Sequence, residues 1–260
     1  MRIILPKEQI KGQRITISGE KARYLISVLR CNAGDELQVF DGEGSFYKSR
    51  ISGIDNKEVK IDLLEKIPFD TESPLNLILM QGILKGEKMD LVIQKATELG
   101  VKEIIPAITV RSQVRETRKA ARWRKIAEEA SRQSGRTGIP KVREPVDFSS
   151  WLIANSSLKL KGFIFWEEGG LSLKEAIKHS AVSIQHLKNS QLSTLNSQLF
   201  VAIGPEGGFT KEEVKLAESR GLIATSLGKR ILRAETAAIS AVTLVQFLMG
   251  DIAGCPASGG

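Results

Sequence analysis

The stretch that decides the fold reads Leu199-Phe-Val-Ala-Ile-Gly-Pro-Glu-Gly-Gly-Phe-Thr210. It predicts a strand that ends at Gly204 and then a glycine-rich turn, and Thr210 with Glu213 has the spacing of a capping box that opens a helix ending at Gly221. Such a turn, between the carboxyl end of a strand and a helix, exposes backbone N–H groups to a ligand. The signal is weak by itself, because glycines also serve turn geometry and the G-x-x-G-G spacing is not that of a dinucleotide site.

Strands and helices alternate in the part of the chain around this stretch. Leu75–Met80 is a near-continuous apolar run, typical of a strand covered on both faces, and residues 86–99 carry apolar side chains at helical spacing. Further strands are predicted at 103–108, 162–166 and 224–227, with a basic helix at 117–134. The alternation predicts an α/β domain with a mostly parallel sheet over residues 74–253.

The first 70 residues follow a different pattern. Short strands are predicted at 15–17, 36–40, 46–51 and 59–64, with a short helix at 21–29. Closely spaced short strands indicate a small β-barrel over residues 1–70, joined to the next domain by a linker. The repeated Asn-Ser-Gln-Leu within 189–199 predicts a surface loop without a function of its own, and 254–260 a disordered tail.

The positive charge of the chain is gathered in one segment. The formal net charge is +8, and residues 111–143 alone carry eleven Lys or Arg side chains against three Glu. A polyanion partner requires a basic surplus of this kind, because neutralised phosphates release counterions. A solvated basic helix without a partner is the alternative. An anionic membrane surface fits less well, because most apolar residues of the segment are alanines. We therefore expect a nucleic acid.

Several classes of protein are excluded by the sequence. No apolar run is long enough to span a bilayer, the N-terminus lacks the apolar core of a signal peptide, and two distant cysteines make neither a disulfide framework nor a zinc site. The P-loop, H-E-x-x-H and G-x-S-x-G motifs are absent, and the two histidines lie in or beside the polar insertion. We expect a cytoplasmic protein with no metal and no membrane partner.

A second polar block follows the strand predicted at 224–227. It reads Leu227-Gly-Lys-Arg-Ile-Leu-Arg-Ala-Glu-Thr-Ala-Ala238 and leads into a nearly wholly apolar helix at 237–249. Charged side chains in front of a buried helix are costly to hide, so they should face a ligand or each other. An ion pair between Arg233 and Glu235 that caps the helix is the alternative. Two polar, glycine-bearing loops after two strands of one sheet favour a ligand site.

Four blocks together resemble the 16S ribosomal RNA (uracil-N3)-methyltransferase family, which belongs to the SPOUT methyltransferases. The blocks are residues 85–100, 129–136, 203–209 and 227–237, and they occur in the family order within a match that extends to Asp251. The resemblance implies a SPOUT-type α/β domain with a C-terminal trefoil knot after a PUA-like barrel. It implies S-adenosyl-L-methionine in the knot loops, a homodimer, and a uridine in the decoding region of 16S rRNA of the small ribosomal subunit as substrate.

The resemblance also assigns site residues. Cofactor-binding positions are Glu167, Ile203, Gly204, Glu206, Gly207, Gly208, Leu227, Gly228, Ile231, Leu232, Arg233, Thr236 and Ala237. Ala234 stands where the family commonly has Thr, which removes one hydroxyl. RNA-binding positions are Arg30 in the barrel and Gln133, Ser134 and Arg136 in the second block, to which the basic segment adds Arg115, Arg118, Arg122 and Arg132.

Methylation at N3 of uracil sets the expected catalytic roles. The base reacts best as its anion, whose charge spreads onto two carbonyl oxygens, so an arginine at an oxygen would stabilise it. We expect Arg136 or Arg233 to stabilise this charge, with Glu206 or Glu235 as proton acceptor or orienting group.

Two alternatives remain open at this point. One is a SPOUT enzyme of other specificity, such as a ribose 2′-O-methyltransferase. The other is a non-catalytic RNA-binding assembly protein that keeps the fold, against which the intact Gly-Pro-Glu-Gly-Gly and Leu-Arg-x-Glu-Thr blocks argue.

Overall fold

The computed structural model describes residues 1–55, 57–67, 71–157, 159–180 and 198–252. Most of the predicted surface loop at 189–199 and the predicted tail at 254–260 lie outside these residues. The chain divides into two compact units: residues 1–72 with 131–139, and residues 73–130 with 140 onward. No sequence pattern indicated that residues 131–139 group with the first unit, and the domain boundaries expected from the sequence, 1–70 and 74–253, stay a prediction. None of the described helices is both long and apolar enough to cross a membrane.

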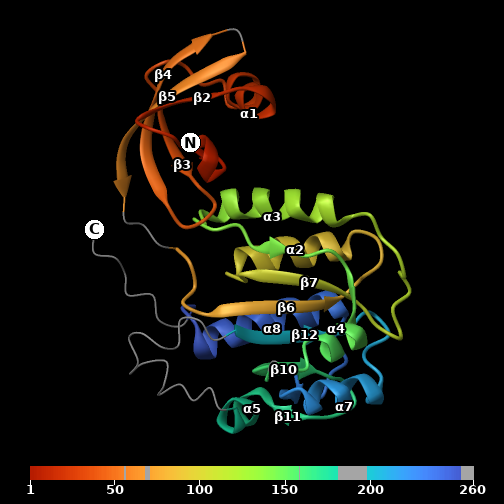
Figure 1. The fold of residues 1–260 in the computed structure, drawn as a ribbon. Coiled ribbons are helices and arrows are strands. Elements are labelled where there is room, and N and C mark those ends of the chain that lie inside the picture. The colour runs from red at the N-terminus through yellow and green to blue at the C-terminus, as the bar shows by residue number, and fades with distance from the viewer. Residues whose placement is uncertain (56, 68–70, 158, 181–197, 253–260) are drawn as a thin grey trace. The chain divides into compact units, whose positions relative to one another are not determined.

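The first unit is a curled five-stranded sheet (Figure 1). Its strands follow the order β1-β3-β4-β5-β2 and its short helical segments are η1, α1 and the π-turn η2. Their bounds are β1 Arg2–Ile4, η1 Lys7–Gln9, β2 Arg14–Ile17, α1 Gly19–Arg23, η2 Tyr24–Val28, β3 Glu36–Phe40, β4 Phe46–Asp55 and β5 Glu58–Ile67. Alternate residues such as Leu37, Val39, Ile51 and Ile61 point into one apolar core, as the period of two in a strand requires.

The second unit is an eight-stranded sheet in which every strand pairing is parallel. The order is β11-β13-β10-β12-β6-β7-β8, and β9 also pairs with β7. The strands are β6 Asn76–Gly82, β7 Glu103–Ile108, β8 Lys141–Val142, β9 Val146–Asp147, β10 Gly162–Phe165, β11 Leu171–Ser172, β12 Gln198–Ile203 and β13 Leu222–Ser226. The prediction of an α/β domain with a mostly parallel sheet is confirmed.

Helices cover this sheet on both faces. They are α2 Lys88–Glu98, α3 Ala120–Ser134, α4 Phe148–Ala154, α5 Leu173–His179, α7 Lys211–Ser219 and α8 Ala234–Met249. Helices α4 and α7 pack on the face that carries Ile78, Met80 and Phe200, while α2 and α8 contact each other and α8 contacts β12 (Figure 1). Strands β12 and β13 lie on the two sides of β10, so their connection passes across β10. The trefoil knot stays a prediction.

Parallel pairing brings the carboxyl ends of all these strands to one edge of the sheet. Five loops therefore meet there, and they follow β6, β7, β10, β12 and β13. The loop after β12 leads into α7 through the predicted capping box, in which the Thr210 hydroxyl accepts from Glu213 N–H and the Glu213 carboxylate accepts from Thr210 N–H. This edge is where a ligand site of an α/β sheet is expected.

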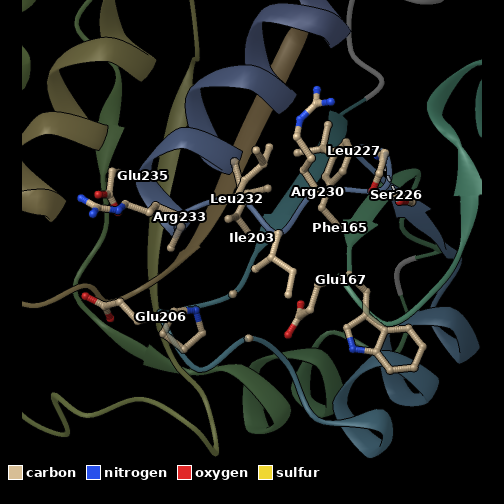
Figure 2. A pocket seen from close by; sticks show the side chains of 18 of the residues that line it. Phe165, Glu167, Ile203, Glu206, Ser226, Leu227, Arg230, Leu232, Arg233 and Glu235 are labelled. Carbon is tan, nitrogen blue, oxygen red and sulfur yellow. Dashed lines mark hydrogen bonds between the residues drawn. The ribbon is translucent and has the colours of Figure 1, made fainter.

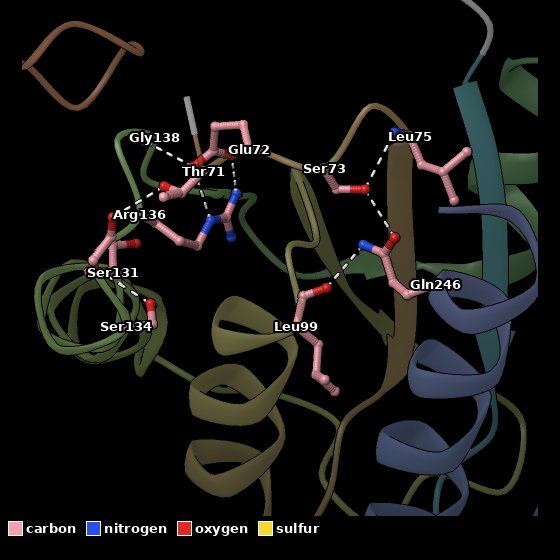
Figure 3. A network of polar contacts seen from close by, with 11 residues as sticks. Thr71, Glu72, Ser73, Leu75, Leu99, Ser131, Ser134, Arg136, Gly138 and Gln246 are labelled. Atoms are coloured by element: carbon pink, nitrogen blue, oxygen red, sulfur yellow. Dashed lines mark hydrogen bonds and ion pairs between the residues drawn. The ribbon is translucent and has the colours of Figure 1, made fainter. Parts of the chain in front are cut away.

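A buried ion pair ties residues 131–139 into the first unit (Figure 3). Arg136 is 4% exposed, and its Nε and Nη2 donate to the two carboxylate oxygens of Glu72 at 3.1 and 2.6 Å. The Glu72 carboxylate also accepts from Gly138 N–H at 2.9 Å, and the Thr71 hydroxyl donates to the Gly135 carbonyl. Arg136 is thus held by a bidentate contact that a buried guanidinium needs, since a buried charge without a partner is costly.

We expect Glu72→Gln to lower the free energy of unfolding by about 3 kcal/mol, because it removes the negative charge that forms a bidentate contact with the buried Arg136 cation. Urea denaturation followed by circular dichroism measures this. The matched control is Glu144→Gln, whose carboxylate is 71% exposed and faces Arg124 at 2.6 Å. A surface pair contributes less than about 1 kcal/mol. Equal losses in the two variants would contradict a structural role for the buried pair.

Candidate active site

A cavity of about 590 Å³ lies at the carboxyl edge of the parallel sheet (Figure 2). The loops after β10, β12 and β13 and the first turn of α8 form its wall, and Lys88 of α2 closes one side. A volume of this size is ordinary for a small-molecule site. The three loops come from strands that are neighbours in the sheet, so the pairing of β12 with β10 and of β10 with β13 is what brings them together.

Most of the residues predicted to hold a cofactor line this cavity. They are Glu167, Ile203, Gly204, Glu206, Gly208, Leu227, Gly228, Ile231, Leu232, Arg233 and Ala237. Gly207 and Thr236 are not part of the wall. Residues such as Phe165, Trp166, Ser226 and Arg230 also line it, although the sequence analysis did not assign them. Their position at or just beyond the ends of β10 and β13 is the signal that would have identified them.

The loop after β12 is packed too closely for a larger residue at Gly208. This glycine has φ +68°, in the left-handed region, and a Cβ there would collide with the carboxylate of Glu167. The Glu167 side chain therefore lies against the backbone of the glycine-rich turn and forms part of the cavity wall (Figure 2). The glycine allows the loops after β10 and β12 to approach each other.

Glu206 is held as a carboxylate at the mouth of the cavity. Its Oε1 accepts from Lys85 N–H at 3.1 Å and from Lys88 Nζ at 3.4 Å. Burial opposes ionisation of Glu206, but hydrogen bonds from its own N–H and from Lys85 and Lys88 outweigh it, so its pKa is lowered. A carboxyl group with a lowered pKa orients its neighbours well but is a weak acceptor of protons.

Arg233 and Glu235 lie together at the start of α8 (Figure 2). Arg233 is the exposed N-cap residue of this helix, and no ion pair joins it to Glu235, although both residues are described. One carboxylate oxygen of Glu235 is buried and has no hydrogen-bond partner among the described residues. The alternative of an Arg233–Glu235 ion pair that caps the helix is therefore wrong, and both side chains stand at the cavity wall.

Arg136 does not belong to the cavity wall. Its guanidinium is buried in the first unit against Glu72, whereas every residue that lines the cavity belongs to the second unit. The geometry gives no support to Arg136 as a group that contacts substrate or RNA. Of the two arginines expected to stabilise a developing negative charge, Arg233 has the required position.

The residues predicted to bind RNA differ in how far they are already engaged. Arg115 folds back on its own loop and donates to the carbonyls of Thr109 and Val110 at 3.2 and 2.6 Å. Arg122 donates to Asp90, which also accepts from Trp123 Nε1, and Arg132 stacks over the ring of Tyr24. Arg118 is exposed and makes no ion pair with any described residue.

Three other predicted RNA contacts lie on exposed surface. Gln133 and Ser134 are exposed at the last turn of α3. Arg30 is exposed in the first unit, where its φ of 52° places it in the left-handed region that non-glycine residues seldom occupy. It directly follows the π-turn η2 and Leu29. No group of three or more His, Cys, Asp or Glu side chains that could hold a metal occurs among the residues the structure describes.

Comparison with known proteins agrees with this geometry. Residues 71–246 match the model of an RNA methyltransferase domain, and residues 17–64 match an RNA methyltransferase PUA domain. The chain is 34% identical to the ribosomal RNA small subunit methyltransferase E of Buchnera aphidicola, over 96% of this chain and 94% of that protein.

Two solved structures resemble the whole chain. One is a ribosomal RNA small subunit methyltransferase E from Neisseria gonorrhoeae bound to S-adenosyl methionine, with a TM-score of 0.82 and 31% identity, covering 96% of this chain and 98% of the other. The second is a methyltransferase from Legionella pneumophila in complex with the same cofactor, with a TM-score of 0.81 and 33% identity at the same coverage.

We expect the contribution of Glu206 to stability to depend on pH. Because its folded-state pKa is lowered from the ordinary 4.5, the contribution is present above that value and is lost as the pH falls through the lowered pKa. The difference in unfolding free energy between the wild type and Glu206→Gln should therefore be constant near neutral pH and shrink in acid.

Urea denaturation between pH 7 and pH 3 (roughly the range spanning the transition) measures this difference. In a Lys88→Met background the pH-dependent part of this difference should be smaller and its loss should be complete at a higher pH, because one interaction that lowers the folded-state pKa of Glu206 is gone. If the difference in unfolding free energy between the wild type and Glu206→Gln grew as the pH fell, the pKa of Glu206 would not be lowered in the folded protein.

Proposed function

Since the chain belongs to the ribosomal RNA small subunit methyltransferase E family, we propose that it methylates N3 of one uridine in the decoding region of 16S rRNA, with S-adenosylmethionine as methyl donor. The observation that carries the proposal is the cavity formed by the loops after β10, β12 and β13. A cytoplasmic location and a homodimer are part of the same proposal.

The residues of the cavity suit S-adenosylmethionine. Ile203, Leu227 and Leu232 offer apolar surface for a flat purine ring, and the glycine-bearing turns offer backbone N–H groups. The Glu167 carboxylate, held against Gly208, supplies an acceptor for hydroxyl or ammonium groups. When bound, the cofactor supplies an electrophilic methyl group on a sulfonium centre.

Arg233 and Glu235 are the groups we assign to the uracil. The exposed guanidinium of Arg233 would face a carbonyl oxygen of the base and stabilise the charge that forms when N3 loses its proton. Glu235 also lines the cavity, and one of its carboxylate oxygens has no hydrogen-bond partner among the described residues, so its carboxylate is the better candidate to accept or orient that proton. Glu206, with its lowered pKa, keeps the role of orienting the loop.

A homodimer is supported by exposed apolar side chains on α8 and on the loop before it. Ile231 in the loop is 87% exposed, and Leu244 and Phe247 on α8 are 40% and 52% exposed. Exposed apolar surface of this kind is used in contacts between proteins.

We expect purified protein and S-adenosylmethionine to convert unmodified 16S rRNA into RNA that contains 3-methyluridine. The Ala237→Leu variant should bind the cofactor at least ~10-fold more weakly, because its larger side chain enters the cavity wall at the first turn of α8. Calorimetric titration measures the affinity, and chromatography of the digested nucleosides identifies the product.

The matched control is Ala154→Leu, at an exposed position of α4, which should bind the cofactor as the wild type does. A ribose-methylated nucleoside as the product would contradict the N3 assignment. No cofactor binding and no product on intact small ribosomal subunits would contradict the enzymatic function.

We expect Arg118→Ala to weaken binding of 16S rRNA and to reduce the slope of log affinity against log salt by about one, as for the loss of one phosphate contact. Arg118 is exposed and makes no ion pair with a described residue, so its charge is available. Filter binding at several salt concentrations measures the slope. Lys174→Ala, at an exposed position of α5, is the control and should leave the slope unchanged. An unchanged slope in Arg118→Ala would exclude this contact.

A further inference from the structure

Arg111 contacts the glycine-rich loop from the side opposite the cavity. It lies in the segment between β7 and α3, and its Nη1 donates to the carbonyl of Gly207 at 3.0 Å. The same nitrogen lies 3.8 Å from Oε1 of Glu168, which follows β10. One guanidinium therefore joins the segments that follow three different strands, β7, β10 and β12.

A second contact joins the segment after β7 to the stretch that follows β12. Val110 N–H donates to Oε1 of Glu213 at 2.9 Å, while the other carboxylate oxygen of Glu213 accepts from Thr210 N–H. Glu213 is 3% exposed, so its hydrogen bonds are shielded from water. The segment that begins at Thr109 is thus fixed to both ends of the 207–213 stretch.

Gly207 faces this segment, which explains why it does not line the cavity. A Cβ on Gly207 would lie 2.9 Å from the Cβ of Arg111 and 3.2 Å from its carbonyl oxygen. Its neighbours Glu206 and Gly208 do line the cavity. A contact that fixes the Gly207 carbonyl therefore also fixes its two neighbours, which face the cavity.

We propose that Arg111 is a positioning residue that holds the loop after β12 in its ligand-binding conformation and links it to the basic segment leading into α3. The inference rests on the proposed function, in which this cavity holds S-adenosylmethionine. Because the 109–119 segment carries Arg118 and continues into α3, which carries Arg122, RNA bound there and cofactor bound in the cavity should strengthen each other's binding.

The test is calorimetric titration of S-adenosylmethionine into the wild type, Arg111→Ala and Arg111→Lys, with and without unmodified 16S rRNA. Arg111→Ala should bind the cofactor about tenfold more weakly, because the charge-assisted hydrogen bond to the Gly207 carbonyl and the ion pair with Glu168 are lost. Arg111→Lys should recover part of the affinity, since an ammonium group still faces Glu168 and the Gly207 carbonyl. Lys215→Ala, at an exposed position of α7, should match the wild type.

RNA should tighten cofactor binding to the wild type, and this gain should be smaller in Arg111→Ala. A purely structural role would lower the thermal melting temperature without changing the cofactor affinity of the folded protein or the gain from RNA. Gly207→Ala provides a second probe, because it pushes on Arg111 without adding an atom to the cavity. Combined with Arg111→Ala, it should weaken binding by less than the product of the two single effects.

Three results would overturn the inference. Cofactor affinity of Arg111→Ala equal to that of the wild type would remove the positioning role. If RNA increased the cofactor affinity of the wild type and of Arg111→Ala by the same factor, the link to the basic segment would be excluded. If the effects of Arg111→Ala and Gly207→Ala on cofactor affinity were fully independent, the two substitutions would not act through one contact. If the wild type itself binds no cofactor with or without RNA, the proposed function fails, and the inference fails with it.

Discussion

The parallel pairing of strands in the second unit is the constraint on which the rest of the structure depends. Parallel strands need crossover connections and cover on both faces, which explains why helices alternate with strands. Hydrogen bonding then fixes β10 between β12 and β13, so the loops that follow these strands meet at one edge. Strand pairing thus brings the loops of the cavity together. Contacts between the loops, such as the close approach of Glu167 to Gly208 and the hydrogen bond from Arg111 to the Gly207 carbonyl, then fix their conformation.

The positive charges of the basic segment serve two purposes. Arg122 is paired with Asp90, Arg124 with Glu144, Arg136 with Glu72 and Arg143 with Glu103. These pairs connect the segment to the surrounding structure, and the buried pair, Arg136 with Glu72, lies within the first unit. The charge that remains for a polyanion is therefore smaller than the net charge of the segment, and it is concentrated on residues such as Arg118. The net charge of the segment indicated that its partner is a polyanion. The ion pairs determine which of its basic side chains remain available to bind that partner.

The sequence was sufficient to predict those features that depend on local patterns. Apolar runs predicted β6 and β12, the spacing of Thr210 and Glu213 predicted the cap of α7, and the polar loops predicted most of the cavity wall. Features that depend on contacts between residues far apart in the sequence could not be predicted. The contact of Arg136 with Glu72, for example, joins residues that lie 64 positions apart in the chain, so no local pattern indicated it. Gly207 was expected to line the cavity but faces Arg111 instead. No local sequence pattern indicates which face of a turn another segment covers.

The tryptophans of the described chain lie in three different environments. Trp123 is 1% exposed and donates to Asp90, and Trp151 packs against Phe200. Trp166 alone among them lines the cavity, at the end of β10. An indole ring in the wall of a site is sensitive to the polarity of whatever occupies it. The fluorescence of Trp166 should therefore respond when a ligand replaces solvent in the cavity, whereas Trp123 and Trp151, which do not line it, should contribute a constant background.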